Sequence, residues 1–532
     1  MKVLLAVLPS FELKNQCLPS VGLACIKAYI KKYLPDITIN HLDLRTRAEV
    51  QEIWRPEDFP QITIRKNFVS DIYELSIIAS LIDKYRKSKS INNLFPEQDI
   101  ISRWAYDRTI LPDFIVNKLN MTHKFAIKNF VWCGGYDIVG FSIYTTNLYL
   151  SILTAMLIKI SYPNTKIIFG GPQITQSDST RELLLKSGLV DYLVLGEGEQ
   201  PFLDIINATL NNEPIGNKIG IKTVENMDRL DTFYQESDLE SLPTPDYDDL
   251  QLSKYGHKLV SIYSNRGCPF RCHFCSEHSL FGKKFKRRSP EKVINDMIHI
   301  GKKLDTNTFH FADSLINSSE EWLEEFVKLL EKSKQKFLWE GYFRAEISNE
   351  MAVKMSRVGL DKVILGVESF SQSTLDKMNK KKIKQEILDT INSLVENDVR
   401  TSVNLLVGYP DETEDNFMTS LEVARMLKSK YKDNPNLRFP SRNFQMRPFS
   451  NIYKVHDKFG VSAVSWAEMY DEKYHPEDLK SVFDKTLYTF LVNGISINET
   501  LHRLYLINQV KHLDFFMEEK KDRHYILYHE EE

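Results

Sequence analysis

Short apolar segments alternate with longer segments of helical periodicity along the first two hundred residues. The apolar segments predict strands at Val3–Leu8 and at ITINHLDL, YDIVGFSIY, TKIIFGG and DYLVLGEGE. Helical patterns stand between them, for example VGLACIKAYIKKYL after Pro19 and Ser20, and LYLSILTAMLIKI. Strands that alternate with helices are typical of a parallel sheet covered by helices on both faces. The pattern therefore predicts an α/β fold that begins with a doubly wound, Rossmann-like domain over residues 1–212.

One long segment, at about residues 45–133, interrupts this alternation. Its pattern is mostly helical, as in VSDIYELSIIASLIDKYRK. The segment is longer than the usual connection between a strand and a helix. We expect this insertion to cover a ligand or the substrate entrance.

Ligands of open parallel sheets bind outside the carboxyl ends of the strands. Small and polar residues occupy those ends in the first domain: Thr145, Thr146, Asn147, Gly170, Gly171, Gly196, Glu197, Gly198 and Glu199. These nine residues are the binding candidates of the first domain.

A second alternating region follows a segment rich in proline and aspartate. That segment, ESLPTPDYDDL within residues 213–255, predicts a linker. Six further strands are expected at LVSIYS, TFHFA, FLWEGY, KVILGV, SVNLLV and NFQMR, and one helix between them begins at Ser289 and Pro290. Six βα repeats predict a (β/α)6 partial TIM-type barrel over residues 256–454, with its chemistry at the carboxyl ends of the strands. The helical, aromatic pattern of residues 455–532 predicts a C-terminal helical domain.

Composition and charge narrow the class of protein. The 532 residues have a net charge of −3, which gives no reason to expect a nucleic-acid partner. No apolar run approaches the roughly 18 residues of a membrane span, and the apolar part of MKVLLAVLPSFE is too short for a signal peptide. Cys17, Cys25 and Cys133 are scattered and form no disulfide framework. We therefore expect a cytoplasmic protein.

The other three cysteines, Cys268, Cys272 and Cys275, lie within eight positions of SNRGCPFRCHFCSE, just after the first strand of the second region. Clustered thiolates select zinc or iron–sulfur. Structural zinc takes four ligands, so His273 or His278 would have to be the fourth. An iron–sulfur cube normally takes four cysteines, so three would leave one iron open to a substrate or cofactor. The trio by itself leaves both interpretations open.

The spacing CxxxCxxC, with Phe274 before the last cysteine, resembles the radical S-adenosylmethionine (SAM) superfamily. The resemblance implies that Cys268, Cys272 and Cys275 hold a 4Fe–4S cluster, and that the amino and carboxylate groups of SAM chelate its fourth iron. One electron then cleaves the sulfonium to give a 5′-deoxyadenosyl radical. The resemblance also implies a flavodoxin- or ferredoxin-type electron donor.

Later segments resemble the same superfamily in their order along the chain. The resemblance assigns six residues to SAM: Asp313 and Ser314 in HFADS, Arg344 in GYFRAE, Glu368 and Ser369 in GVESFSQSTLDKMNK, and Gly408 in VGYPDET. Arg344 would pair with the methionine carboxylate through its guanidinium fork. Glu368 and Ser369 would face the cofactor, and Gly408 would let backbone approach the adenosine. In RPFSNIY, Phe449 replaces the glycine of the PGS or PGT segment that is frequent in the superfamily.

The first domain resembles the cobalamin-binding domain that precedes the barrel in one large subclass of the superfamily. The segments that carry this resemblance are LPSVGLACIKAYIKK, FGGPQIT and VDYLVLGEGEQPF. It implies that the nine candidates of the first domain bind cobalamin. The DxHxxG motif of many cobalamin proteins is absent, and His41 is the only histidine before residue 123. The resemblance therefore implies a cobalt without a histidine ligand on its lower face.

The leading hypothesis is a cobalamin-dependent radical SAM methyltransferase that acts on an unactivated carbon of a natural product or peptide. One alternative keeps both cofactors but catalyses cyclisation or rearrangement without methyl transfer. Another is a zinc-stabilised binding protein without catalysis. A methylthiotransferase would resemble a protein with three further clustered cysteines, which Cys17, Cys25 and Cys133 do not provide.

Two other features have two interpretations each. The basic run KKFKRRS is either a solvated loop or a segment in which Arg287 or Arg288 contacts a cofactor or an anionic substrate. Trp339 and the aromatic C-terminal segments either belong to the core or line the substrate pocket.

Overall fold

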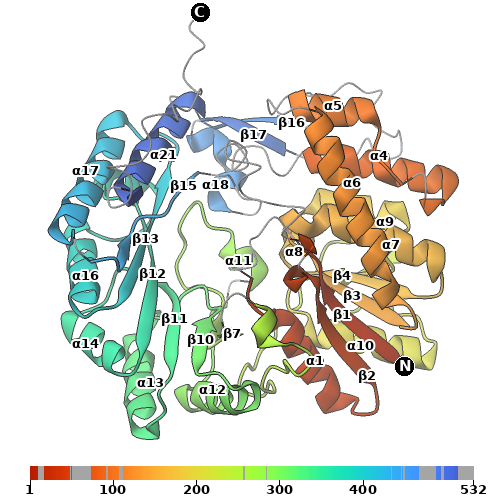
Figure 1. Cartoon of the computed structure of the whole chain (residues 1–532), viewed down its shortest axis with the longest axis horizontal. Coiled ribbons are helices and arrows are strands. Elements are labelled where there is room, and N and C mark those ends of the chain that lie inside the picture. Colours follow the sequence, from red (N-terminus) through yellow and green to blue (C-terminus); the bar gives the residue numbers. More distant parts are fainter. Residues whose placement is uncertain are drawn as a thin grey trace, which may run out of the picture.

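The computed structural model describes residues 1–9, 17–47, 49–50, 73–91, 94–106, 112–255, 258–282, 284–432, 434–444, 446, 450–459, 461–465, 487–492 and 497–512. Two parallel sheets organise these residues, the N-terminal one on the right of Figure 1 and the other on the left.

The first sheet has the strand order β2-β1-β3-β4-β5-β6, in which only β6 is antiparallel to its neighbour. Its strands are β1 (Lys2–Val7), β2 (Thr38–Asp43), β3 (Ile138–Ser142), β4 (Lys166–Gly170), β5 (Tyr192–Val194) and β6 (Ile221–Lys222). The five parallel strands are those that the apolar segments predict.

Helices cover both faces of this sheet, because alternate residues of each strand enter separate cores. Leu4 and Ala6 of β1 pack into one core, whereas Val3 and Leu5 pack into the other. The Leu4 side is covered by α7 (Leu148–Ser161) and α9 (Asp178–Ser187). The short helix α8 (Pro172–Gln176) directly precedes α9. The Val3 side is covered by α1 (Val21–Tyr33) and α10 (Glu199–Asn211). Ser20 caps α1 by accepting a hydrogen bond from the Leu23 amide.

The insertion contains α4 (Tyr73–Ser88), α5 (Gln98–Tyr106) and α6 (Pro112–Asn129), as its helical pattern predicts. Both α4 and α6 pack against α7, so they form a further layer outside the first sheet (Figure 1). No described residue of this insertion lines the cavity beside α1 and α10. Coverage of a ligand or of the substrate entrance by the insertion stays a prediction.

The second sheet is entirely parallel, with the order β14-β13-β12-β11-β10-β7, and β15 also pairs with β13. Its strands are β7 (Leu259–Ile262), β10 (Thr308–Phe311), β11 (Leu338–Phe343), β12 (Leu360–Glu368), β13 (Arg400–Val407), β14 (Leu437–Arg438) and β15 (Ser441–Asn443). The α/β organisation that the sequence predicts is thus confirmed in both halves.

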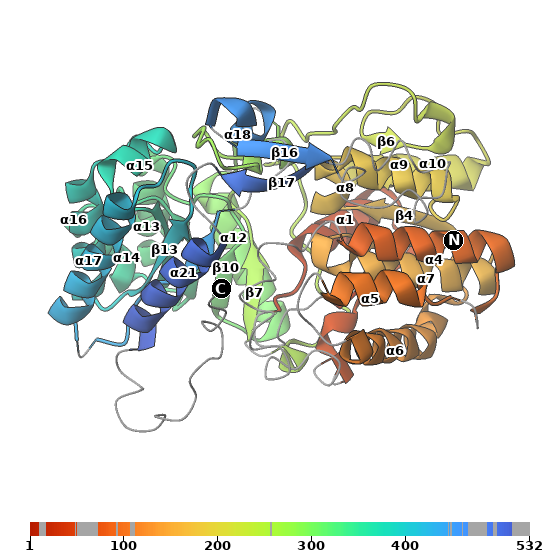
Figure 2. The ribbon, with the colours of Figure 1, turned by 90° about the horizontal axis from the view of Figure 1, so that it is seen from above.

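Six helices connect these strands: α12 (Pro290–Leu304), α13 (Glu320–Ser333), α14 (Asn349–Arg357), α15 (Gln372–Lys377), α16 (Lys384–Glu396) and α17 (Glu414–Lys430). In Figures 1 and 2, α14, α16 and α17 lie on the side of the second sheet that faces away from the first sheet. Trp339 points to this outer side, where it packs edge-to-face with Phe311 and Phe326. Trp339 therefore belongs to the core. Ser289 caps α12, with Pro290 at its first position, as expected.

The remaining elements are short or C-terminal. An antiparallel hairpin of β8 (Asn265–Arg266) and β9 (Lys286–Arg287) brackets α11 (Glu277–Leu280). The C-terminal region contains α18 (Asn451–Lys454), the antiparallel pair β16 (Val461–Ser465) and β17 (Leu487–Val492), and α21 (Ile497–His512). The prediction of a purely helical C-terminal region is wrong for LYTFLV, whose aromatic and β-branched residues favour a strand. The segment WAEMYDEKYH lies outside the described residues.

Candidate active site

The three clustered cysteines lie on the loop between β8 and α11, and all three thiols are free and partly buried. The residues between them are anchored elsewhere in the second half of the chain. The His273 amide donates to the Met378 carbonyl (3.0 Å), and the Asn379 side chain donates to the Arg271 carbonyl (2.8 Å). Phe274 packs against the apolar cluster of Met378, Tyr409 and Ile452. The chain between the cysteines is thereby fixed by contacts that do not use the sulfurs.

The surroundings of the thiols fit a metal cluster. Burial raises the pKa of the Cys275 thiol to about 12 and also raises the pKa of Cys268, so metal loading must displace protons from both. The Glu277 amide donates to Cys275 Sγ (3.4 Å), and Arg344 Nη1 lies 3.9 Å from Cys272 Sγ. Such donors stabilise a bound thiolate and tune the potential of an iron–sulfur cluster.

Zinc is the alternative occupant of this loop, and a single zinc ion needs sulfur or nitrogen ligands within about 2.3 Å of one point. Among the described residues, no three His, Cys, Asp or Glu side chains converge to hold a metal ion, and this includes the three cysteines. The side-chain positions therefore do not distinguish zinc from an iron–sulfur cluster. The Nδ1 atom of His273 lies 2.9 Å from the Lys377 carbonyl.

Arg344 follows β11 and lies next to the cysteine loop. Pairing with the carboxylate of a SAM molecule bound at the cluster would require this position. Its guanidinium lies 3.7 Å from the centre of the Phe270 ring, and its Nε is 3.0 Å from Glu346. Only 6% of Arg344 is exposed. The side chain is therefore held in place by a ring and a carboxylate, with one nitrogen directed towards Cys272.

Glu368 and Ser369, at the end of β12, point in opposite directions. Glu368 has a φ of +71°, lies 3.7 Å from Lys380 Nζ, and has a pKa that is raised by burial. Non-glycine residues with positive φ are uncommon, and those that occur are often found at functional sites. Ser369 is buried and bonds Ser420 of α17 (3.1 Å). A role of Ser369 beside SAM stays a prediction.

Asp313 and Ser314 have partners within the protein. Asp313 accepts hydrogen bonds from the amides of Ser264 (2.8 Å) and Asn265 (3.2 Å), and burial raises its pKa to about 6. Its carboxyl group thus ties the end of β10 to the end of β7. Ser314 donates to Glu277, a partly buried residue two positions after Cys275 that no sequence motif marks.

Gly408 forms the turn after β13, under the C-terminal helix α21. It has a φ of +78°, and its amide donates to Glu412 (2.9 Å). A Cβ at this position would lie 3.1 Å from Thr500. Arg503 of α21 lies 3.1 Å from the same Glu412 carboxylate, so the turn is held from two sides. Phe449 lies outside the described residues.

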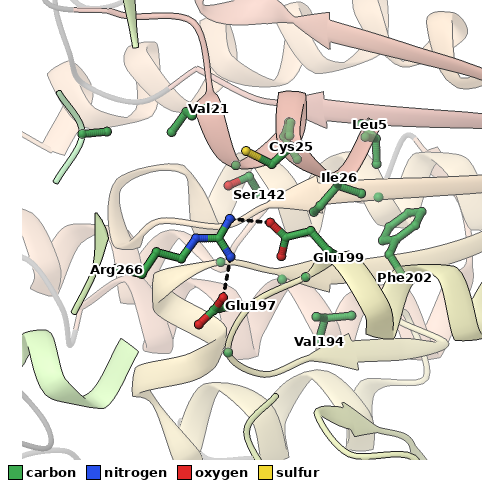
Figure 3. A pocket seen from close by; sticks show the side chains of 18 of the residues that line it. Leu5, Val21, Cys25, Ile26, Ser142, Val194, Glu197, Glu199, Phe202 and Arg266 are labelled. Atoms are coloured by element: carbon green, nitrogen blue, oxygen red, sulfur yellow. Dashed lines mark hydrogen bonds and ion pairs between the residues drawn. The ribbon is translucent and has the colours of Figure 1, made fainter. Parts of the chain in front are cut away.

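A cavity of about 200 Å³ lies between the first sheet, α1 and α10, and it reaches residues of the second half of the chain. Six of the nine candidates of the first domain line it: Gly170, Gly171, Gly196, Glu197, Gly198 and Glu199. Further lining residues include Leu5, Val21, Cys25, Ile26, Ser142, Val194, Phe202 and Arg266 (Figure 3).

Thr145, Thr146 and Asn147 do not line this cavity; they form the 3-10 turn after β3. Asn147 is fully buried, and its side chain donates to the Ser142 carbonyl (3.1 Å). Thr145 donates to Gln173 (2.7 Å). In this structure the three residues shape the turn beside the cavity.

Arg266 joins the two halves of the site. It reaches from β8 between Glu197 and Glu199 in the cavity wall, 2.5 Å from Glu199 Oε1 (Figure 3). Lys286 of β9 also pairs with Glu197. The hairpin that brackets Cys268, Cys272 and Cys275 is therefore tied to the first sheet on both of its strands.

Residues 262–424 match the family model of the Radical SAM superfamily, and this region contains the cysteine loop, Arg344, Glu368 and Gly408. This part of the chain is therefore similar to radical SAM enzymes. It is 26% identical over 302 residues to an uncharacterised methyltransferase of Pyrococcus horikoshii, with 56% of this chain and 65% of that protein covered. It is 28% identical over 302 residues to the anaerobic magnesium-protoporphyrin IX monomethyl ester cyclase of Rubrivivax gelatinosus, with 54% of each covered.

These matches span about half to two thirds of the length of the curated relatives. A solved structure with a similar fold is that of the radical SAM methyltransferase TsrM from Kitasatospora setae with cobalamin and a 4Fe–4S cluster bound. Its TM-score is 0.59 at 15% identity, with 95% of this chain and 90% of TsrM covered. None of the helices described here is both long and apolar enough to cross a membrane.

Arg287 and Arg288 of the radical SAM domain do not lie in a solvated loop. Arg288 is buried and pairs with Asp296. The guanidinium of Arg287 lies 4.9 Å from the ring centres of both Phe285 and Trp322. Both arginines therefore hold the β8–β9 hairpin against its neighbours.

Proposed function

We propose that this protein is a radical SAM enzyme that binds cobalamin and methylates an unactivated carbon of its substrate. In this proposal residues 1–212 form the cobalamin-binding domain, residues 213–255 the linker, residues 256–454 the (β/α)6 partial barrel, and residues 455–532 the C-terminal region. A flavodoxin- or ferredoxin-type protein is the proposed electron donor. The proposed setting is the cytoplasm.

The observation that carries this proposal is the closeness of the cavity to the cysteine loop. Arg266 lines the cavity and stands two residues before Cys268. A group bound at the cavity mouth would therefore lie beside the metal site. A methyl carrier and a radical generator must act on the same substrate carbon, and this arrangement brings their sites together.

The cavity residues fit part of a cobalamin molecule. The cavity volume of about 200 Å³ is below the roughly 300–1,000 Å³ of a complete ligand pocket. The cavity would therefore suit a flat base of the nucleotide tail of cobalamin, and the corrin ring would lie outside it. In the cavity wall, Gly140 leaves room for the Phe202 ring, because a Cβ at this position would lie 2.7 Å from it. His41 is buried, with its pKa lowered to about 4 by burial, and does not line the cavity. We therefore do not propose His41 as a ligand of the bound group.

Bound 4Fe–4S, SAM and cobalamin would supply electron transfer, the 5′-deoxyadenosyl radical and the methyl group. The chain positions them. Cys268, Cys272 and Cys275 would hold the cluster, while Arg344 and Glu368 would orient the polar groups of SAM. Gly408 would let the backbone approach the adenosine. The paired Glu346 and Lys380 keep Arg344 and Glu368 from moving.

A second candidate is cyclisation, which the similarity to the magnesium-protoporphyrin IX monomethyl ester cyclase supports. A cyclase would use the same cofactors as the methyltransferase but would not transfer a methyl group to its substrate. The two functions are separated by the products of SAM in the anaerobically reconstituted enzyme with cobalamin and a strong reductant. Methyl transfer yields S-adenosylhomocysteine together with 5′-deoxyadenosine. Formation of 5′-deoxyadenosine alone contradicts methyl transfer and favours the cyclase.

Filling the cavity is expected to weaken cobalamin binding without unfolding the protein. At Gly170 an added Cβ would meet Val194 at 3.5 Å, an ordinary contact, so Gly170→Val extends into the cavity with little strain. We expect cobalamin to bind the variant at least about tenfold more weakly, since roughly 1.4 kcal/mol of contact is enough for that change. Equilibrium dialysis measures the binding. Equal affinity of variant and wild type would contradict the assignment of this cavity.

A further inference from the structure

The inner face of the second sheet is polar and partly exposed. Residues of its strands alternate between the outer core and this inner face: Phe309, Phe311 and Trp339 are buried outside, whereas His310, Glu340, Tyr342, Lys362 and Glu368 point inward. Tyr342 is 42% exposed, an unusual value for an aromatic residue in the middle of a parallel sheet. Its ring meets His310 edge-to-face at 6.2 Å.

Most cations of this region are paired with carboxylates. The pairs are Lys362 with Glu340 (3.5 Å), Lys380 with Glu368 (3.7 Å), Arg344 with Glu346 (3.0 Å) and Arg400 with Asp361. Arg438 of β14 and Arg442 of β15 have no carboxylate partner among the residues that the structure describes. The edge of the sheet formed by β14 and β15 therefore carries unmatched positive charge.

Arg442 points to the inner face. It is in register with Leu406 of β13, an inner-face position, whereas Asn443 is in register with the buried Val407. The charge of Arg442 acts on both Tyr342 and Glu368, lowering the pKa of each against the effect of burial. Arg438 has no such effect on either residue. Arg442 thus lies across the inner face from Tyr342 and near the residues proposed for SAM.

We propose that Arg442 and Tyr342 anchor a carboxylate-bearing, partly aromatic or flat apolar portion of the substrate on the inner face of the second sheet. The inference rests on the proposed function, which places the radical chemistry at the carboxyl ends of these strands. A guanidinium binds a carboxylate through two parallel N–H bonds. The exposed Tyr342 offers a ring face for apolar contact and a hydroxyl that donates to the same anion.

The positive charge of Arg442 would also suit the carboxylate of SAM. The test therefore has to distinguish binding of a substrate carboxylate from binding of the SAM carboxylate. The first probes are 9-anthracenecarboxylate and 9-anthracenemethanol, which share a ring system and differ in charge. Their binding to the anaerobically reconstituted enzyme is followed by fluorescence. SAM binding is measured in parallel by equilibrium dialysis.

We expect Arg442→Gln to weaken binding of the carboxylate about tenfold or more and to leave the alcohol unchanged, because a hydrogen bond to a charged group is worth about 1.5–3 kcal/mol. Tyr342→Ala should weaken both probes. Arg438→Gln removes the same charge from the neighbouring strand and should change neither.

Three results would overturn the inference. The first is equal binding of 9-anthracenecarboxylate by the wild type and by Arg442→Gln, and the second is a wild type that does not prefer the carboxylate to the alcohol. The third is a loss of SAM affinity in Arg442→Gln with unchanged probe binding. The last result would assign the charge to the cofactor. None of them removes the cluster or SAM cleavage, so failure of this inference is distinguishable from failure of the proposed function.

Discussion

Replacement of Cys268, Cys272 and Cys275 together by alanine is expected to abolish the brown iron–sulfur absorbance and the formation of 5′-deoxyadenosine. The reason is the donor set: soft thiolates bind an iron–sulfur cluster, and the neighbouring residues of the loop are engaged in fixing the backbone. Without the cluster no electron reaches the sulfonium. The measurements are iron and sulfide analysis, the visible spectrum, and chromatography of the nucleoside after anaerobic reconstitution.

A matched control removes the other three cysteines. Cys17, Cys25 and Cys133 are buried and lie outside the loop, so the alanine variant at these positions should retain the cluster. Persistence of the absorbance and of 5′-deoxyadenosine in the first variant would refute Cys268, Cys272 and Cys275 as the ligands of the cluster. About one zinc per wild-type chain, with neither iron nor sulfide after reconstitution, would instead support the zinc-stabilised binding protein.

The largest expected effect on stability is that of Arg266→Met. Arg266 is 9% exposed, and its partners Glu197 and Glu199 are 2% and 4% exposed. Removing one partner of a buried ion pair leaves uncompensated charge and costs about 3–5 kcal/mol. We expect the free energy of unfolding in urea to fall by this amount at neutral pH. Arg400→Met, which breaks an exposed pair with Asp361, should cost about 1 kcal/mol or less.

Urea titrations of the wild type and of both variants measure this difference. A loss in Arg266→Met that is no larger than the loss in Arg400→Met would contradict a stabilising role of the buried Arg266 pairs with Glu197 and Glu199.

Strands β1, β3, β4 and β5 were predictable because they are buried in the first sheet and appear as continuous apolar runs. In the second sheet the apolar residues of β10, β12 and β13 alternate with partly exposed ones, which is also typical of strands. The cysteine spacing likewise marked the loop for which we predict a metal cluster. Glu368 and Ser369 show where sequence reasoning stops: a motif names neighbouring residues but does not say which of them faces inward. LYTFLV was misread because a short aromatic run at the edge of a helical pattern has no unique period.

Arg266 and Glu277 could not be found from the sequence. Each has its partners far away along the chain, Glu197 and Glu199 for the first and Ser314 for the second. A single charged residue beside a cysteine motif carries no signal of such long-range pairing. The same holds for Arg442, whose place opposite Tyr342 depends on the curvature of the whole sheet.

The attachment of the β8–β9 hairpin has a consequence for protein engineering. Arg266 and Lys286 connect the cysteine-bearing stretch to Glu197 on both sides. A chimera that exchanges the catalytic half for that of another enzyme, with the junction in the linker, would separate these arginine and lysine side chains from their carboxylates. A workable module boundary must carry Glu197 and Glu199 with the hairpin, so the two halves cannot be interchanged as independent parts.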